Sequence, residues 1–342
     1  MSPPAFTPVQ GPLRRDGSCF AAIDLGSNNC RLLIATPSDR HFRILDSFSR
    51  IVRLGEGLAA SGQISEAAIT RACAALSICA RKVAAHRVIG ARYIATQACR
   101  IARNGAAALE RIEAVSGLSF EIIDAAEEAR LSVDACLDLA RSDVDHLLVL
   151  DIGGGSTELA WVELRNQNKS AQRRRSGTIV KWMSLPIGVV TLAERYPETT
   201  PHHVWFQQMQ EEILAALNDF DADRAIHTAF AQGRAQLIGT SGAATSLTAI
   251  ALGLRRYERR RVDGRIMQIS DLRQAIADLA ALGPFGRMAN PCIGQGRADL
   301  VLPGAAILSA LMEAFAAVEI CVADRGLREG LLLSMMYGSD PN

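Results

Sequence analysis

The sequence lacks several features that would assign it to a class at once. Its eight cysteines include no Cys-x-x-Cys pair, so a zinc ribbon is excluded, and their scatter favours buried reduced thiols over a disulfide framework. Neither sign of charge dominates, because 37 basic residues face 36 acidic ones, and any anion binding must therefore be local. A hydrophobic share of 49% with only 5% aromatic residues is typical of an ordinary soluble enzyme.

No segment is suited to export or to crossing a membrane. Residues 1–17 are rich in proline and have no apolar core, so they are unlike a secretory signal, and we expect a disordered tail. The longest apolar stretch, 300–323, contains Pro303, Glu313 and Glu319, which favours a buried helix over a membrane span. We therefore expect a cytoplasmic protein with no membrane partner.

The most informative stretch is residues 148–159, Leu-Val-Leu-Asp-Ile-Gly-Gly-Gly-Ser-Thr-Glu-Leu, which predicts a strand, a tight turn and a second strand. The three glycines leave no side-chain bulk, so backbone N–H groups can close on an oxyanion, and Ser156 and Thr157 add hydroxyl donors. Asp151 and Glu158 flank the turn as oxygen ligands suited to Mg²⁺ bound to a phosphate. An ordinary glycine-rich hairpin turn is the alternative interpretation.

A second copy of this pattern lies at residues 20–34, where a strand ends at Asp24 and a Leu-Gly-Ser turn leads into another strand. Two such hairpins suggest two lobes that face one phosphate. A P-loop is excluded because neither turn carries its lysine. A Rossmann fingerprint is excluded because both turns lead into strands and not into a helix.

The motifs Asp24-Leu-Gly-Ser-Asn28 and Asp151-Ile-Gly-Gly-Gly-Ser-Thr-Glu158 resemble the phosphate motifs of the actin, Hsp70 and sugar-kinase superfamily. Within it, the chain is similar to the exopolyphosphatase/guanosine pentaphosphate phosphatase (Ppx/GppA) family. Further similar segments follow in order: 95–100, 127–131, 185–188, 238–242, 297–304 and 326–330. The resemblance implies an α/β fold of two actin-like (ribonuclease H-like) lobes, each a mixed sheet flanked by helices, around an interdomain phosphate cleft. Longer members carry an additional helical domain, and we expect the short two-domain form.

A length of 342 residues also favours two domains. The first is expected to cover 18–124 plus 324–342, and the second 125–323. Within the first, Ser65 is expected to cap a helix that runs to Ala85. After a strand at 88–95, Arg100 is expected to open another helix.

Glu127 and Glu128 stand at a predicted helix start, where two acids suit the helix dipole, so capping is the ordinary interpretation. The resemblance implies instead that one of them is the catalytic base that activates water. Glu128 is favoured because Ala-Arg follows it, and Glu127 stays the alternative. The resemblance also implies that Arg100 lies at the phosphate cleft, with a solvated helix-start arginine as the alternative.

The predicted phosphate ligands are Gly26, Ser27, Asn28, Arg100, Gly153, Gly154, Gly155, Ser156 and Thr157. The predicted metal ligands are Asp24, Asp151 and Glu158, which would hold Mg²⁺ or, as the second choice, Mn²⁺.

Two basic stretches, 169–175 and 255–261, are ordinarily interpreted as a solvated loop and a solvated helix end. Either could contact a polyphosphate, and the second could contact a guanine nucleotide. Nucleic acid is disfavoured by the neutral net charge and the single interleaved aromatic. A small-residue turn at 239–247 opens a helix and would tolerate an anion or nucleotide.

The resemblance implies hydrolysis of a terminal phosphoanhydride, with inorganic polyphosphate as the preferred substrate and release of orthophosphate. Guanosine pentaphosphate is the main alternative, and guanosine tetraphosphate is a further candidate ligand. An ATP-dependent kinase or ATPase and a non-catalytic sensor of polyphosphate or alarmone are the alternatives from other classes. A homodimer is expected from the family.

Overall fold

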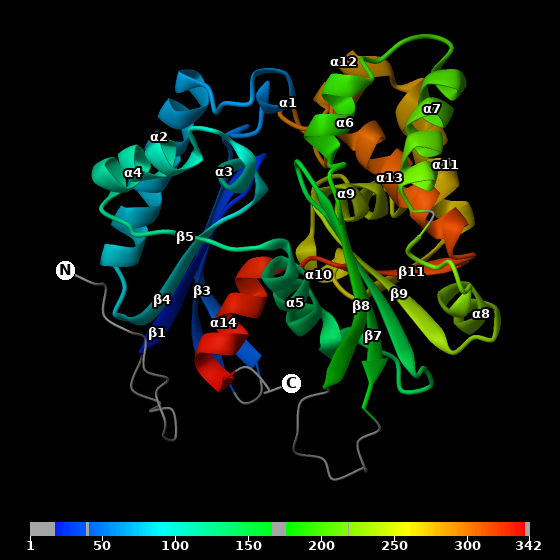
Figure 1. The fold of residues 1–342 in the computed structure, drawn as a ribbon, viewed down its shortest axis with the longest axis horizontal. Helices are drawn as coiled ribbons and strands as arrows, with labels where there is room; N and C mark the ends of the chain where they lie inside the picture. The colour runs from blue at the N-terminus through cyan, green and yellow to red at the C-terminus, as the bar shows by residue number, and fades with distance from the viewer. Residues whose placement is uncertain (1–17, 39–40, 166–175, 218, 339–342) are drawn as a thin grey trace.

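The computed structural model describes residues 18–38, 41–165, 176–217 and 219–338, and it shows two α/β lobes side by side (Figure 1). The predicted tail 1–17 and the basic stretch 169–175 lie outside these residues. Within the described ranges, no helix is long and apolar enough to cross a membrane.

The first lobe is built on a five-stranded sheet of order β3-β2-β1-β4-β5. Its strands are β1 (Cys19–Leu25), β2 (Asn29–Ser38), β3 (His41–Ile51), β4 (Val88–Ala95) and β5 (Glu121–Ile122). β1, β2 and β3 form an antiparallel meander, whereas β4 runs parallel to β1 and β5 parallel to β4. The predicted first hairpin is therefore confirmed, and Asp24 lies near the end of the central strand β1, where it pairs with Arg31.

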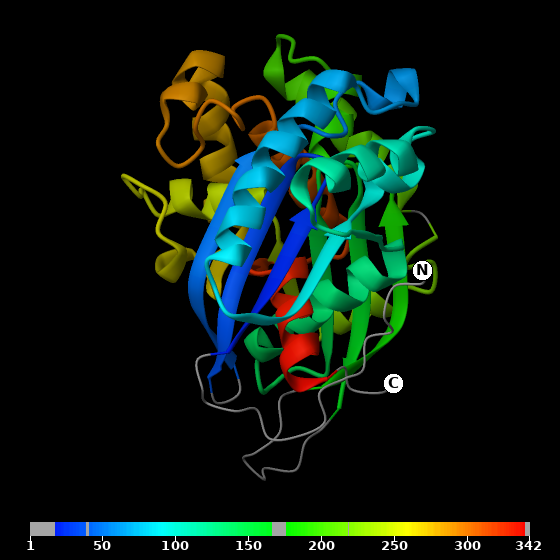
Figure 2. The same ribbon diagram turned by 90° about the vertical axis from the view of Figure 1, so that its left-hand side faces the viewer.

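Helices α1 (Leu58–Ser61), α2 (Glu66–Ala84), α3 (Gln97–Ile101) and α4 (Gly105–Ser116) complete this part of the lobe, and α2 crosses in front of the strands in Figure 2. The predicted cap is confirmed, because the Ser65 hydroxyl accepts a hydrogen bond from the Ala68 N–H. The prediction that Arg100 opens a helix is wrong. Thr96 is the residue before α3, and Arg100 lies in its last turn, because the chain turns directly at the end of β4.

The second lobe repeats the same plan on a six-stranded sheet of order β10-β11-β9-β6-β7-β8. Its strands are β6 (His146–Ile152), β7 (Thr157–Leu164), β8 (Gly177–Leu185), β9 (Ala235–Thr240), β10 (Arg265–Gln268) and β11 (Glu319–Ala323). β6, β7 and β8 form an antiparallel meander, β9 is parallel to β6, and β11 is parallel to β9. The predicted second hairpin and the two mixed sheets are thus confirmed.

The helices of the second lobe are α5 (Ala125–Cys136), the 3₁₀ turn η1 (Leu137–Leu139), α6 (Val189–Arg195), α7 (His202–Ala216), α8 (Ala225–Ala231), α9 (Gly242–Ala251), α10 (Arg259–Val262), α11 (Ile269–Ala281), α12 (Gly283–Ala289) and α13 (Val301–Ala314). α13 is buried along most of its length and packs against α6, α7, α9 and α11. The apolar stretch after residue 300 is therefore core, as its proline and acids predicted.

The chain passes between the lobes before α5 and again before α14 (Leu327–Tyr337). α14 packs against β1, β2 and β4 of the first sheet and also against α5, which lies on strands β6–β8. These two helices therefore pack against each other between the two sheets (Figure 1). The domain boundaries at 124/125 and 323/324 stay a prediction.

Candidate active site

The two hairpin turns touch each other where the lobes meet. A Cβ atom added to Gly154 would lie 2.9 Å from the Asn28 nitrogen and 3.1 Å from the Ser27 Cβ. One added to Gly155 would lie 3.0 Å from the Ser27 hydroxyl oxygen. Glycine is required at these positions because no side chain fits between the turns. The two predicted phosphate motifs consequently form one continuous floor.

Gln97, which sequence reasoning did not select, holds the two turns together. Its Nε2 donates a hydrogen bond of 3.0 Å to the Gly155 carbonyl, and its Oε1 lies 3.5 Å from the Ser27 hydroxyl. Gln97 is buried at the start of α3, within the 95–100 segment that resembles the family. The resemblance of this segment could have indicated Gln97, but the prediction made from it named Arg100.

The predicted phosphate donors separate into two groups. The N–H of Gly26 donates to the Asn29 carbonyl and that of Gly153 to the Ser156 carbonyl, each at 2.9 Å, so these two amides close their own turns. The Thr157 hydroxyl is fully buried and donates to the Ile187 carbonyl at 2.6 Å. Thr157 does not line the cavity above the floor, whereas the other predicted residues of the two turns do: Gly26, Ser27, Asn28, Gly153, Gly154, Gly155 and Ser156.

This cavity has a volume of about 990 Å³ and is lined by residues of both lobes. Six carboxylates line it: the predicted Asp24, Glu128, Asp151 and Glu158, and also Asp324 and Glu329. Burial raises the pKa of Asp151 to about 6. Burial and then the neighbouring Asp151 raise the pKa of Glu158 to about 7, and burial and then Glu158 raise that of Glu128 to about 8. Burial also raises the pKa of Asp24. The arrangement concentrates negative charge that a cation would stabilise.

The donor set fits a magnesium ion that is shared with a phosphate. The Asp24 Oδ1 is buried and has no hydrogen-bond partner, and the same holds for the side-chain oxygens of Asn28 and Asn29. No three His, Cys, Asp or Glu side chains in the described part of the chain converge closely enough to enclose a metal by themselves. Mg²⁺ commonly takes only one or two carboxylates and completes its shell with water and substrate phosphates. The protein therefore offers part of a coordination shell.

Of the two candidate bases, the structure brings only Glu128 to the cavity. Its Oε2 accepts a hydrogen bond of 2.7 Å from the Arg100 Nη1, and its side chain is 8% exposed. Glu127 pairs instead with Arg130 at 2.7 Å and with Arg92 at 3.5 Å, and it does not line the cavity.

Arg100 does not line the cavity either. Its Nη1 also donates to the Ile123 carbonyl at 2.7 Å, so the guanidinium is fixed behind Glu128. Its contact with a phosphate, which the resemblance implied, stays a prediction. The geometry makes Arg100 a positioning residue for Glu128.

We expect Arg100→Gln to move the pH dependence of hydrolysis to higher pH. Arg100 lowers the pKa of Glu128, so its removal raises that pKa further, and the ionised carboxylate forms only at higher pH. The measurement is the pH profile of kcat/KM, whose rising limb should shift upward from its wild-type position. Arg92→Gln, which removes one of the two arginine partners of Glu127, is the matched control. A raised KM with an unshifted limb would show that Arg100 acts on substrate instead.

The raised carboxylate pKa values also predict how stability depends on pH. A folded-state pKa above the unfolded value favours the protonated form, so stability is present at low pH and is lost as pH rises through the folded pKa. With Glu128 at about 8 and Glu158 at about 7, the melting temperature of chelator-treated protein should fall between pH 5 and 8.5. The accompanying loss in the free energy of unfolding is on the order of a few kcal/mol, and Glu128→Gln should make this loss smaller. A melting temperature that rises through this interval in wild type would contradict the prediction.

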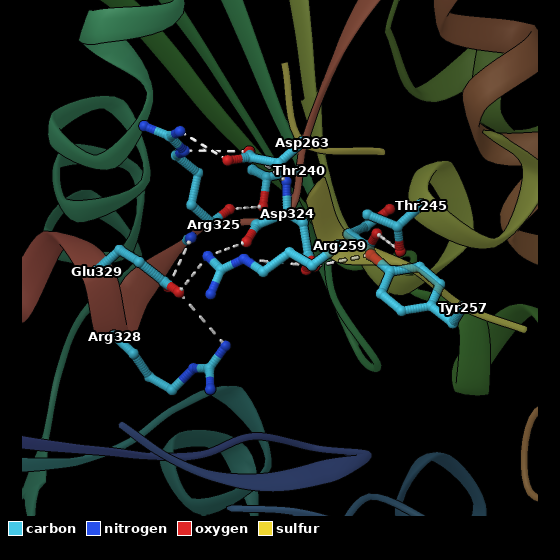
Figure 3. Close-up of polar contacts among 11 residues, drawn as sticks. Thr240, Thr245, Tyr257, Arg259, Asp263, Asp324, Arg325, Arg328 and Glu329 are labelled. Atoms are coloured by element: carbon cyan, nitrogen blue, oxygen red, sulfur yellow. Dashed lines mark hydrogen bonds and ion pairs between the residues drawn. The ribbon is translucent and has the colours of Figure 1, made fainter. Parts of the chain in front are cut away.

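A network of charged side chains ties α14 to the second lobe (Figure 3). Arg259 lies between Asp324 and Glu329: its Nη2 donates to the Asp324 carbonyl at 2.5 Å and to the Glu329 Oε1 at 3.1 Å. The Tyr257 hydroxyl donates to the Asp324 Oδ2 at 2.7 Å. Burial acts to raise the pKa of Glu329, but Arg328 and Arg259 lower it overall, so the carboxylate is ionised. The second crossover between the lobes is therefore anchored by ion pairs.

Three further arginines add positive charge to the wall of this cavity. Arg31, Arg50 and Arg297 line it, and none of them forms an ion pair with an acid in the described ranges. Burial and then the neighbouring Arg31 lower the pKa of Arg297, and together they outweigh the raising effect of Tyr257 and Asp324. An anion that extends from the floor into this region would meet these groups.

Comparison with known proteins agrees with this geometry. Residues 33–338 match a family model described as the Ppx/GppA phosphatase family. Exopolyphosphatase 2 of Mycobacterium tuberculosis is 28% identical over 329 residues, which cover 92% of this chain and 98% of that protein.

Solved structures give the same result. An exopolyphosphatase-like protein superimposes with a TM-score of 0.79 at 28% identity, covering 92% of this chain and 97% of its own. The PPX-GPPA enzyme of Aquifex aeolicus superimposes with a TM-score of 0.71 at 26% identity, covering 93% and 99%.

Proposed function

Because this chain belongs to the Ppx/GppA phosphatase family and is thus a phosphoanhydride hydrolase, we propose that it releases orthophosphate from the end of inorganic polyphosphate. The observation that carries the proposal is the buried Glu128 carboxylate facing a cavity that is floored by two phosphate turns. Guanosine pentaphosphate, which also ends in a phosphoanhydride, is the second candidate. Arg31, Arg50 and Arg297, which line the cavity and form no ion pair among the described residues, favour polyphosphate because they suit a chain of successive anions.

In the proposed reaction, the terminal phosphate lies on the floor. Its oxygens accept hydrogen bonds from the hydroxyls of Ser27 and Ser156 and from the backbone of Gly154 and Gly155. These hydrogen bonds become stronger as negative charge develops on the phosphate oxygens. Glu128 takes a proton from the attacking water as the new P–O bond forms. The bond to the bridging oxygen breaks, and the shortened chain leaves as an anion.

The role of Arg100 is to keep Glu128 oriented and to favour its ionised form. Asp24, Asp151 and Glu158 would hold the metal, with Mg²⁺ preferred over Mn²⁺. When bound, the ion neutralises charge on the transferring phosphoryl group. Ser132 and Ser184 orient two of these carboxylates, since their hydroxyls donate to Asp151 at 2.6 Å and to Glu158 at 2.8 Å.

The test is phosphate release with Mg²⁺ from long-chain polyphosphate, guanosine pentaphosphate and ATP under identical conditions. The proposal predicts the highest kcat/KM for polyphosphate. Faster release from guanosine pentaphosphate would support the second candidate, and faster release from ATP would indicate an ATPase. Tight binding of polyphosphate with no release from any of the three would indicate a sensor.

A further inference from the structure

The segment 255–262, Arg-Arg-Tyr-Glu-Arg-Arg-Arg-Val, forms part of the cavity's wall, and some of its side chains are fixed inward. Tyr257 and Arg259 line the cavity and are held by the Asp324 bonds described above. Val262 is fully buried in the core of the second lobe. These inward anchors fix the orientation of the whole segment.

The other arginines of the segment consequently point outward. Arg260 and Arg261 lie between the inward residues Arg259 and Val262 on the single turn of α10, and both are exposed. Arg255 and Arg256 precede Tyr257 and are exposed as well. Among the residues that the structure describes, the only ion pairs of this segment are made by Arg259. We call these four residues, Arg255, Arg256, Arg260 and Arg261, the rim arginines.

The rim arginines stand beside a cavity that already contains unpaired cations. Arg50 of β3 lines the same cavity as Tyr257 and Arg259, and its guanidinium carbon lies 5.3 Å from the centroid of the Phe48 ring. In Figure 2, the blue outer strands of the first sheet and the yellow part of the chain, which includes 255–262, both lie at the left-hand side of the molecule. Positive charge therefore continues from inside the cavity to the surface next to it, on a protein whose net charge is only +1.

We propose that the rim arginines bind the part of a long polyphosphate that extends out of the cavity while its end lies on the phosphate turns. This inference rests on the proposed function and names its substrate class, a polyanion longer than the cavity can hold. A tripolyphosphate is short enough for a cavity of about 990 Å³, whereas a chain of hundreds of phosphates must leave it. Unpaired exposed guanidiniums are suited to such a chain because they neutralise successive phosphates and release their counterions.

This binding is the same in the ground state and the transition state, so it lowers KM and leaves kcat unchanged. The test is a variant with all four rim arginines replaced, R255Q/R256Q/R260Q/R261Q. Its kcat/KM for long-chain polyphosphate should fall by about tenfold or more at low salt, with a shallower dependence of log KM on log salt. Its kcat/KM for tripolyphosphate should change less than about twofold.

The matched control is R81Q/R87Q/R103Q/R273Q, which removes the same charge from four exposed arginines that do not line the cavity. This control should leave kcat/KM unchanged for both long-chain polyphosphate and tripolyphosphate. An equal loss for long and short substrates, or an equal loss in the control, would overturn the inference.

Direct binding separates this inference from the proposed function. Wild type and the rim variant are titrated with fluorescently labelled long-chain polyphosphate in the presence of Mg²⁺, without relying on hydrolysis. Weaker binding by the rim variant supports the inference even if wild type proves to hydrolyse guanosine pentaphosphate. Equal affinity of the two proteins for long-chain polyphosphate overturns it even if polyphosphate is hydrolysed.

Discussion

Replacing Glu128 with glutamine is expected to lower kcat for polyphosphate by about 10²- to 10⁴-fold, the usual contribution of a general base. The amide keeps the size of the side chain and can still accept the Arg100 hydrogen bond at the position of Oε2. It cannot take a proton from water. Affinity for polyphosphate should change by less than about threefold, because the phosphate donors lie on the two turns and not on α5.

Glu127→Gln is the matched comparison, since the two residues are adjacent in the first turn of α5. It breaks pairs with Arg130 and Arg92 outside the cavity and should leave kcat near the wild-type value. Normal turnover by Glu128→Gln with an inactive Glu127→Gln would overturn the assignment of the base. Unfolding would not explain the expected loss, because removal of a buried carboxylate with a raised pKa should stabilise the protein at pH 8.

The features that could be predicted from the sequence are those determined by neighbouring residues. The period and turn residues of the two hairpins predicted their strands, and the hydroxyl of Ser65 predicted a helix start. Asp124 similarly caps α5 by accepting a hydrogen bond from the Glu127 N–H, which gives Glu127 and Glu128 their first-turn positions. From that point, helical geometry sends adjacent side chains in different directions.

The direction of each side chain could not be predicted, because it depends on distant segments. The direction of the Glu128 side chain depends on its hydrogen bond with Arg100, 28 residues earlier in the chain. Gln97 is likewise held by a hydrogen bond to Gly155, 58 residues later. Nor could the sequence predict that the N–H groups of Gly26 and Gly153 form hydrogen bonds that close their own turns. A glycine-rich motif predicts that backbone can approach a ligand, but the turn's own hydrogen bonds decide which amides remain free.

Gly188→Ala should cause the second large loss of activity, although Gly188 lies 33 residues beyond the glycine turn. Its φ of −122° is accessible to alanine, so backbone strain is not the reason. A Cβ atom there would lie 2.5 Å from the carbonyl carbon and oxygen of Gly154 and from the nitrogen of Gly155. These are backbone atoms, so the contact can be relieved only by moving backbone apart, which displaces the phosphate turn relative to the segment that holds it.

The segment that begins at Gly188 also orients that turn. The Val189 and Val190 N–H groups donate to the carbonyls of Gly153 and Gly154 at 3.0 and 2.7 Å, which directs those carbonyls toward the start of α6. The opposite edge of these two peptide groups therefore faces the cavity. Displacing the turn should lower kcat/KM by about 10²-fold or more, the cost of losing one preorganised donor to a developing oxyanion.

The control is Pro186→Ala in the same segment, because the Pro186 side chain is exposed whereas Gly188 is buried. It should keep kcat/KM within about threefold of wild type, as surface substitutions usually have small effects. The melting temperature of Gly188→Ala should fall, so activity is measured well below it, with circular dichroism to verify folding. If folded Gly188→Ala keeps kcat/KM within threefold of wild type, the position of the Gly154 and Gly155 backbone does not determine catalysis, and the donors in the proposed mechanism are wrong. A loss concentrated in kcat would show that the turn stabilises the transition state, whereas a loss confined to KM would limit its role to holding the substrate.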